Sequence, residues 1–296
     1  AQSALSERLA SAGILPMFGF PTRVRLLFTN VPFRGFPWPP ERGTVDRDLD
    51  VAISQFAPGS ETVKDKRVYR AAGVADLFPA GETVRVRPGL SPPLKDDNDA
   101  PVGNIRIGIC RSCQAVAYLE RSAAPPAGGV EPPPLRCPVC GDVAMPAVDA
   151  REPRSFFCCF SDDFDGSFDW VPQATRPMMC VSTDNLSAIA KTNLALHSSA
   201  TEVISINDNG GEGGFDFHSV ALQRAQGTGA YAVDTHFWER LNTPSYRIAL
   251  LSRRHTDVMV ADLRDWPHGL YADPRGVPGR AAWYSLAFLL RTAASA

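Results

Sequence analysis

The chain carries its clearest fold signal at residues 46–70, DRDLDVAISQFAPGSETVKDKRVYR. In the first half, apolar residues recur at the spacing of one helix face: Leu49, Ala52, Ile53 and Phe56. Asp46 or Asp48 would cap this helix, because an aspartate side chain accepts a hydrogen bond from an unpaired N–H of the first turn. In the second half, residues 61–70 predict two short strands around a polar turn at residues 64–66. A helix followed by a hairpin indicates an α+β fold.

The rest of the chain predicts the same mixture of short strands and helices. Helices are expected at residues 3–12 and 281–294, while residues 246–255 fit either a strand or a helix. A strand is expected at residues 23–28, and strands with turns are expected at residues 156–170, 201–209 and 215–222. The proline-rich stretch at 88–101 is the best boundary in the first half. We therefore predict three regions, 1–100, 101–147 and 148–296, of which the middle one is an inserted zinc-ribbon module with four cysteine ligands.

Composition is that of a soluble globular protein. Of the 296 residues, 44% are apolar and 21% are charged, and the net charge is −2. There is no apolar run of about 18 residues, so we expect no membrane-spanning segment. The first residues lack the pattern of a signal peptide, and we expect a cytoplasmic protein. The chain starts without Met and ends inside a helical pattern, so we expect it to be part of a longer protein.

Four cysteines form two closely spaced pairs. Cys110 and Cys113 have two residues between them, as do Cys137 and Cys140, and 23 residues separate the pairs. Zn²⁺ favours four tetrahedral ligands, and a two-residue spacing lets a tight turn bring both sulfurs to the metal. Gly141 permits the left-handed backbone that such a turn uses. This pattern predicts a structural zinc ion with a closed shell, which leaves no open position for catalysis.

The remaining candidate sites favour structural roles. Cys158, Cys159 and Cys180 lie among apolar residues and are expected to be buried core thiols, while His218 and His236 are expected to be structural. The acidic run at 161–169 lacks the first and last ligands of a calcium loop and is expected to be a turn between strands. The glycine-rich segment 207–214 does not match a nucleotide-binding loop and predicts a hairpin turn.

Motor motifs are missing from the sequence. There is no Gly-Lys dipeptide, so no P-loop, and no Asp-Glu dipeptide, so no Walker B motif of that type. Neither a Gly-x-Ser-x-Gly nucleophile elbow nor a His-Glu-x-x-His metal helix occurs. We therefore predict that this chain is not an enzyme in its own right.

Two blocks resemble a known family. Residues 50–74, DVAISQFAPGSETVKDKRVYRAAGV, resemble the run that precedes the zinc-binding region of MrfA-type helicases. Residues 13–25, GILPMFGFPTRVR, are similar to the corresponding stretch of the DrmB family, a subunit of the DISARM anti-phage defence system. The order of the blocks and the four cysteines agrees with that family, and the last helix resembles the start of its C-terminal region.

The resemblance implies a partner of a motor. DrmB-like proteins associate with a separate helicase, DrmA, and the pair engages DNA. The four cysteines carry over as zinc ligands, whereas no catalytic residue does. The expected function is that of a helicase-associated, zinc-binding, DNA-engaging complex subunit in antiviral defence. The alternative is the zinc-binding fragment of an MrfA-like DNA-repair helicase, whose motor lies outside this chain. An interaction module that makes no nucleic-acid contact remains a third hypothesis.

Basic residues near these blocks are candidates for contact with DNA phosphates: Arg23, Arg25, Lys64, Lys66, Arg67 and Arg70. Such contacts would hold DNA without reading its sequence. Alternatively, Arg67 and Arg70 pair with acids such as Glu61 or Asp65, and Arg23 packs beneath its strand. The phenylalanines of this region, at positions 18, 20 and 33, are expected in the core in preference to stacking on bases.

Overall fold

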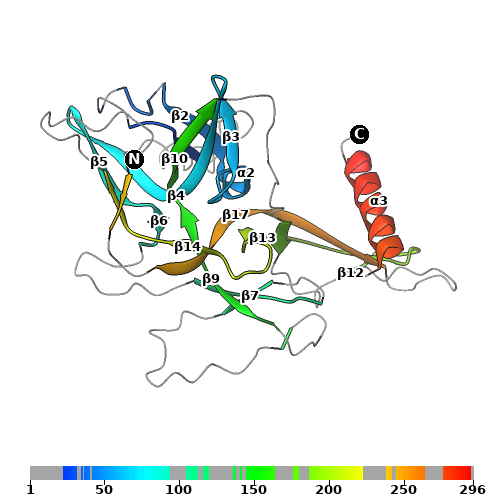
Figure 1. Ribbon diagram of the computed structural model, residues 1–296. Helices are drawn as coiled ribbons and strands as arrows, with labels where there is room; N and C mark the ends of the chain where they lie inside the picture. Colours follow the sequence, from blue (N-terminus) through cyan, green and yellow to red (C-terminus); the bar gives the residue numbers. More distant parts are fainter. Residues whose placement is uncertain are drawn as a thin grey trace, which may run out of the picture.

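The computed structural model describes residues 23–31, 35, 37–40, 42–93, 105–112, 116–119, 136–137, 141, 145–163, 176–179, 187–222, 238–241, 245–263 and 276–294. Two mixed β-sheets, a two-stranded ribbon and two helices make up this part of the chain (Figure 1). The architecture is mainly β and is α+β in the broad sense, as the sequence predicts. The helix expected at 3–12 lies outside the described residues.

The first sheet has six strands, in the order β2-β1-β10-β4-β3, with β5 on the far half of β4. Its strands are β1 (Val24–Phe28), β2 (Thr44–Asp48), β3 (Glu61–Lys64), β4 (Arg67–Ala80), β5 (Thr83–Pro88) and β10 (Ser155–Asp163). β1 runs parallel to β10, and every other pair is antiparallel. The strand predicted at 23–28 and the hairpin predicted at 61–70 are both confirmed.

Helix α2 (Leu49–Gln55) follows β2 directly. The Asp48 side chain accepts a hydrogen bond from the Asp50 N–H at 3.0 Å, so the predicted cap at Asp48 is confirmed. Residues 44–48 are extended because they pair along the whole of β1, which leaves Asp46 in a strand. Strand pairing therefore selects Asp48 over Asp46 as the cap, and the helix begins at Leu49, the first residue of the apolar pattern.

The second sheet has nine strands, in the order β11-β13-β17-β9-β7-β8, with β12 on β13, β14 on β17 and β6 on β9. Its strands are β6 (Leu90–Ser91), β7 (Ile105–Ile109), β8 (Val116–Leu119), β9 (Ala147–Pro153), β11 (Arg176–Met179), β12 (Ser187–Ala188), β13 (Leu194–Asn207), β14 (Phe215–Phe217) and β17 (Tyr246–Leu263). A separate ribbon pairs β15 (Val220–Leu222) with β16 (Trp238–Arg240). The ambiguous segment at 246–255 is thus a strand.

The glycine-rich segment does not form the hairpin turn that its sequence suggests. β13 and β14 both pair antiparallel with β17, where Asn207 faces Leu250 and Phe215 faces Ile248. Residues 208–214 are therefore an excursion between two segments that lie in line, and the expected hairpin is wrong. Gly214 returns the chain to the sheet at φ +123°, where a Cβ atom would lie 2.3 Å from the carbonyl carbon of Ile248. Only glycine fits this position.

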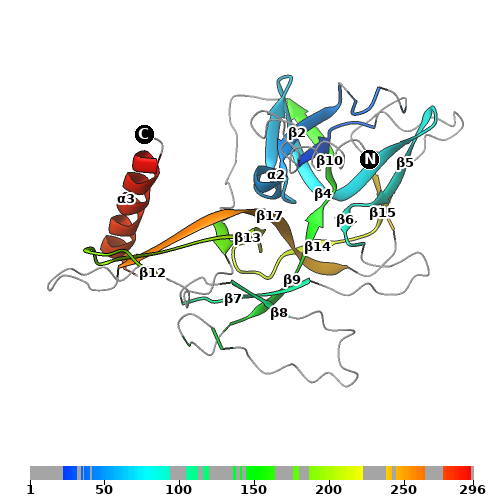
Figure 2. The same cartoon turned by 180° about the vertical axis from the view of Figure 1, so that it is seen from behind.

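Two adjacent crossings join the sheets. β9 continues through Arg154 into β10, and β5 continues through Gly89 into β6, so each run of chain changes sheet (Figure 2). The Arg154 N–H donates to the Gly89 carbonyl at 2.7 Å. A Cβ atom on Gly89 would lie 2.4 Å from the backbone of Ala75, so the β5–β6 corner packs directly on β4. This close backbone approach requires glycine.

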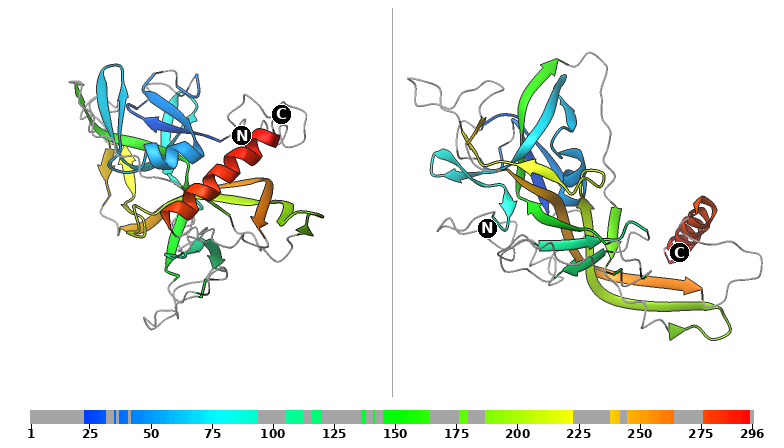
Figure 3. Two further views of the ribbon diagram at one scale, coloured as in Figure 1. Left: turned by 90° about the vertical axis from the view of Figure 1, so that its right-hand side faces the viewer. Right: turned by 60° about the horizontal axis from the view of Figure 1, so that its bottom comes forward.

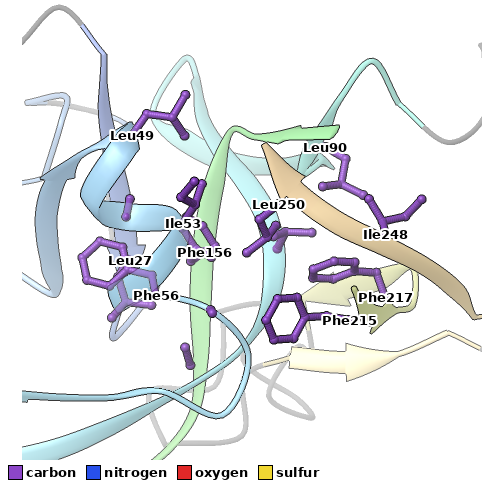
Figure 4. Packing of buried hydrophobic residues seen from close by; sticks show 14 of the residues in the cluster. Leu27, Leu49, Ile53, Phe56, Leu90, Phe156, Phe215, Phe217, Ile248 and Leu250 are labelled. Carbon is purple, nitrogen blue, oxygen red and sulfur yellow. The ribbon is translucent and has the colours of Figure 1, made fainter. Parts of the chain in front are cut away.

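The main core lies where the two sheets face each other (Figure 4). It receives buried side chains from α2, from the first sheet and from β6, β14 and β17, among them Leu27, Ile53, Phe56, Leu90, Phe156, Phe215, Phe217, Ile248 and Leu250. Phe56 and Phe156 meet edge to face, with ring centroids 5.7 Å apart. The buried Asn207 amide donates to the Ile53 carbonyl at 2.8 Å, which ties the end of α2 to β13.

The outer part of the second sheet extends away from this core. β13 and β17 stay paired over 14 residues, from Asn207 opposite Leu250 to Leu194 opposite Leu263. Helix α3 (Val277–Ala294) stands beside the outer end of this ribbon, away from the main core (Figures 1 and 3). The helix predicted at 281–294 is confirmed and begins four residues earlier. Within the described ranges, no helix is both long enough and apolar enough to cross a membrane.

We expect Ile53→Ala to destabilise the fold far more than Val51→Ala. Ile53 is completely buried, whereas the neighbouring Val51 on the same helix is 41% exposed. Removing a buried isoleucine side chain costs about 2–5 kcal/mol through lost burial and the cavity it leaves. Val51→Ala should change the free energy of unfolding by only about 0.5 kcal/mol or less. Urea unfolding followed by circular dichroism measures both values, and equal effects would contradict this assignment of the core.

Candidate functional site

Cys110, the first cysteine of the first pair, directly follows strand β7. β7 and β8 pair antiparallel up to Ile109 opposite Val116, so residues 110–115 connect them. β9 pairs with the other edge of β7, and the Ile109 N–H donates to the Pro146 carbonyl at 3.0 Å. The second cysteine pair precedes β9 in the chain. Antiparallel pairing of β9 with β7 therefore brings Cys110 and Cys137 to the same end of these strands.

Cys110 and Cys137 lie in one small buried cluster. Both are buried, and they pack with Met145, while Ala117 lies against the cluster. The Met145 side chain covers Gly108, where an added Cβ would lie 3.1 Å from the methionine sulfur. Two cysteines that are 27 positions apart in the sequence thus share one packed site, and the small residue at position 108 leaves room for it.

Gly141 adopts the backbone that a metal-binding turn requires. Its φ is +73°, and its N–H donates to the Cys137 carbonyl at 3.0 Å. This hydrogen bond closes a tight turn over residues 137–141, and the left-handed glycine predicted from the sequence is confirmed.

The other two predicted ligands, Cys113 and Cys140, lie outside the described residues. The described part of the chain accordingly contains no group of three or more potential metal ligands and no complete zinc ribbon. What it contains is two buried cysteines, Cys110 and Cys137, in one cluster at the end of a strand pair. If the other two thiolates completed the set, the shell would be closed and would serve a structural role.

Arg23 and Arg25, two of the six candidate DNA-binding cations, lie at the junction of the sheets. The Arg23 guanidinium donates to Ser252 Oγ at 3.1 Å and pairs with Glu152 at 3.4 Å. Arg25 Nε donates to the Pro153 carbonyl at 2.7 Å. Burial lowers the pKa of the Arg25 guanidinium, and the nearby Glu152 carboxylate partly offsets that effect. Both arginines thus bind β1 to the end of β9, and Arg23 packs beneath its strand as the alternative interpretation proposed.

The remaining four cations lie on the β3–β4 hairpin. Lys64 donates to the Thr44 carbonyl. Arg70 Nε donates to Glu61 at 3.0 Å, in the local ion pair that the sequence offered as an alternative to phosphate contact. Lys66 and Arg67 are exposed at the turn, where Asp65 and Lys66 both have positive φ. The six candidates therefore divide into three half-buried side chains, Arg23, Arg25 and Lys64, and three exposed ones, Lys66, Arg67 and Arg70.

A polar network joins distant segments of the chain, and no pattern in the sequence predicted it. The Asp50 carboxylate accepts a hydrogen bond from Ser252 Oγ and pairs with Arg254 at 3.2 Å. Arg253 lies 3.7 Å from both Glu152 and Glu202. No local pattern signals these contacts, because the partners are up to about two hundred residues apart in the chain.

Two exposed arginines beside the candidate ligands were also missed. Arg111 follows Cys110, and Arg136 precedes Cys137, and both side chains are exposed. Their position next to a cysteine is visible in the sequence. What strand pairing adds is that they lie at one end of the β7–β9 pair.

The other predicted structural residues fall in different places. Cys158 is buried in the main core, which confirms that interpretation for this thiol. The side chain of Cys159 and the residues Cys180 and His236 lie outside the described part. His218 is half-buried. The predicted turn at 161–169 begins as strand, since β10 continues to Asp163.

Comparison with known proteins yields no match to this chain, whether with protein-family models, with curated proteins or with solved structures.

We expect Arg23→Met to lower the free energy of unfolding by about 2 kcal/mol. The substitution removes the cation from a largely buried ion pair and leaves Glu152 without one of its partners. Arg85→Met is the matched control, because Arg85 is exposed on β5 and should tolerate the change to within about 0.5 kcal/mol. Chemical denaturation of both variants tests this, and an unchanged midpoint for Arg23→Met would remove its structural role.

Proposed function

We propose that this chain is a non-catalytic, zinc-binding subunit, similar to the DrmB family, of a bacterial anti-phage complex of the DISARM type. In this proposal it associates with a separate, DrmA-like DNA helicase in the cytoplasm and helps that motor engage DNA. The observation that carries the proposal is that the described residues of the two family-like blocks lie in one sheet and its attached helix.

These blocks are separate in the sequence but close in space. The longer block, residues 50–74, spans α2, β3 and the first half of β4. The end of the shorter block, residues 23–25, leads into β1. β1 and β4 both pair with β10, so one strand joins the two blocks. A resemblance that gathers in one structural unit supports common architecture better than scattered similarity would.

A structural zinc ion is part of the proposal. Its ligands would be the thiolates of Cys110, Cys113, Cys137 and Cys140. Support comes from the buried packing of Cys110 and Cys137, and from the left-handed turn at Gly141. Four thiolates leave Zn²⁺ no open coordination position, so this metal would hold the two turns together and activate no water.

DNA contact in this proposal is electrostatic. Lys66, Arg67 and Arg70 are exposed on one hairpin, and Arg111 and Arg136 flank the candidate ligands. Arginine and lysine at such positions hold phosphates without reading bases. Arg23, Arg25 and Lys64 are engaged by other groups of this chain, and their contribution would be to position the sheet that presents the surface cations.

The second candidate function is the zinc-binding region of an MrfA-like DNA-repair helicase. The longer block resembles the run that precedes the zinc-binding region of MrfA-type helicases, and that resemblance supports this alternative. The candidates differ in where the motor lies: on a separate subunit or elsewhere on the same protein.

We expect Cys137→Ser to abolish zinc binding. The wild-type chain should contain one zinc per molecule by elemental analysis. The serine variant should contain almost none, because an alcohol oxygen is a poor substitute for a thiolate. Cys158→Ala is the control and should keep the metal, since Cys158 lies in the main core. A full complement of zinc in Cys137→Ser would contradict the ligand assignment.

We expect the chain to have no ATPase activity alone and to co-purify with a DrmA-like helicase subunit. DNA affinity of that complex should fall steeply between about 50 and 200 mM salt, because phosphate contacts release counterions. Lys66→Gln with Arg67→Gln should flatten this salt dependence, whereas the exposed Arg85→Gln should not.

An intrinsic DNA-stimulated ATPase in the full-length protein alone would favour the MrfA-like alternative. DNA affinity that is flat across the salt series would leave only protein partners.

A further inference from the structure

Among the large apolar side chains of the described structure, those on helix α3 have the highest exposed fractions. Val277, Tyr284, Phe288 and Leu289 are between 62% and 71% exposed. The outer ribbon adds Ile189 and Met259, at 38% and 53%. Six of the nine large apolar side chains that are exposed in the described residues therefore belong to α3 and the ribbon beside it. Concentration of this kind marks an interaction surface, whereas single exposed apolar residues are ordinary.

The helix is apolar on two opposite sides. One side contains the buried Gly279 and the half-buried Trp283, Leu286 and Leu290. The other contains Val277, Tyr284 and Phe288, at the helical spacing i, i+7, i+11, and it is open. A surface helix normally turns a polar side to water. The second, exposed apolar side of α3 therefore indicates a binding partner that covers it.

The charged residues of α3 limit which partner could cover its open apolar side. α3 contains two arginines and no acidic residue. Arg280 and Arg291 are eleven positions apart, which places them on the same side of the helix and about 16 Å apart along its axis. Successive residues of an α-helix are rotated by about 100°, so that side lies next to the open apolar stripe formed by Val277, Tyr284 and Phe288. The open stripe thus has a cation near each end.

We propose that α3 is a docking helix, and that its occupant is a groove on the motor subunit with an apolar floor and a carboxylate near each end. This inference rests on the proposed function, because it takes the helicase as the partner. The recognition mode is an amphipathic helix laid in a groove, with Tyr284 and Phe288 as its aromatic anchors. The two arginines set the orientation of the helix by pairing with the groove's acidic ends.

A second copy of this chain fits the stripe poorly. α3 has no acidic residue, so in a pair of α3 helices the arginines would find no carboxylate on the other helix. An antiparallel pair would in addition bring Arg280 near Arg291 of the other copy, which places cation against cation and costs affinity. A membrane surface also fits poorly, because a helix lying on lipid needs a polar side opposite its apolar side. On α3 the opposite side carries Trp283, Leu286 and Leu290.

The test is the affinity of the full chain for the helicase subunit, measured by biolayer interferometry. Tyr284→Ala with Phe288→Ala should weaken binding at least about tenfold, since aromatic anchors dominate such interfaces. Alanine is the strongest helix former, so circular dichroism should show the helix retained. Arg280→Glu with Arg291→Glu should also weaken binding. Matched controls are Val63→Ala and Arg85→Glu, exposed positions on the first sheet that should keep wild-type affinity.

The outcomes separate the two proposals. If the wild-type chain binds the helicase and the α3 variants bind equally well, the docking inference is overturned and the proposed function stands. If the wild-type chain does not bind, the proposed function fails and the inference fails with it.

Three further results would assign the stripe to a different occupant and so overturn the inference. The first is a dimer of the chain alone that the double variant Tyr284→Ala with Phe288→Ala no longer forms. The second is sedimentation of the chain with anionic phosphatidylserine vesicles that the same double variant loses. The third is a lower melting temperature of the double variant than of the wild-type chain when no partner is present.

Discussion

The fold depends on the place where two runs of chain cross between the sheets side by side. β9 becomes β10 at Arg154, β5 becomes β6 at Gly89, and the backbone hydrogen bond between these residues joins the corners. The Gly89 corner lies directly against the backbone of Ala75, with no room for a side chain. Since β10 supplies the middle of the first sheet and β9 pairs with both β7 and β17 in the second, this junction sets the relative position of both sheets. The main core fills the space that results.

The same junction explains the division among the basic residues. Arg23 and Arg25 enter β1 next to the end of β9, and there they meet Glu152, Ser252 and the Pro153 carbonyl. Ionised groups in such a place need partners, because burial without them is costly. The hairpin of β3 and β4 lies at the edge of the first sheet, and Lys66 and Arg67 are exposed at its turn. Cys110 and Cys137 lie on the other side of the junction, at the end of the strands that extend from β9. These exposed cations and these two cysteines are thus separated from the main core.

A polar network and an apolar helix are surface features of two different kinds. Asp50, Ser252 and Arg254 contact one another across more than two hundred positions of sequence, so these three polar groups find partners within the chain. α3 is different, because no described side chain covers its open stripe, on which the Tyr284 hydroxyl is the one polar group. An assembly of several chains provides a physical reason for such a helix, since the area that stays exposed in one subunit becomes buried in the complex.

Local patterns in the sequence were enough to predict a helix capped by Asp46 or Asp48, the polar turn of the β3–β4 hairpin and the terminal helix. Each depends on neighbours within a few positions, through capping, turn geometry or side-chain periodicity. Tertiary structure alone decided the rest. Pairing with β1 made residues 44–48 a strand, and pairing with β13 over 14 residues made β17 a strand where periodicity left a helix open. β13 and β14 both pair with β17. The glycine-rich segment between them is therefore an excursion from the sheet, whereas its composition suggested a hairpin turn. The partners of Arg23 and Arg25 were equally invisible, since an ion pair is determined by distance in space and those carboxylates and carbonyls lie more than a hundred residues away.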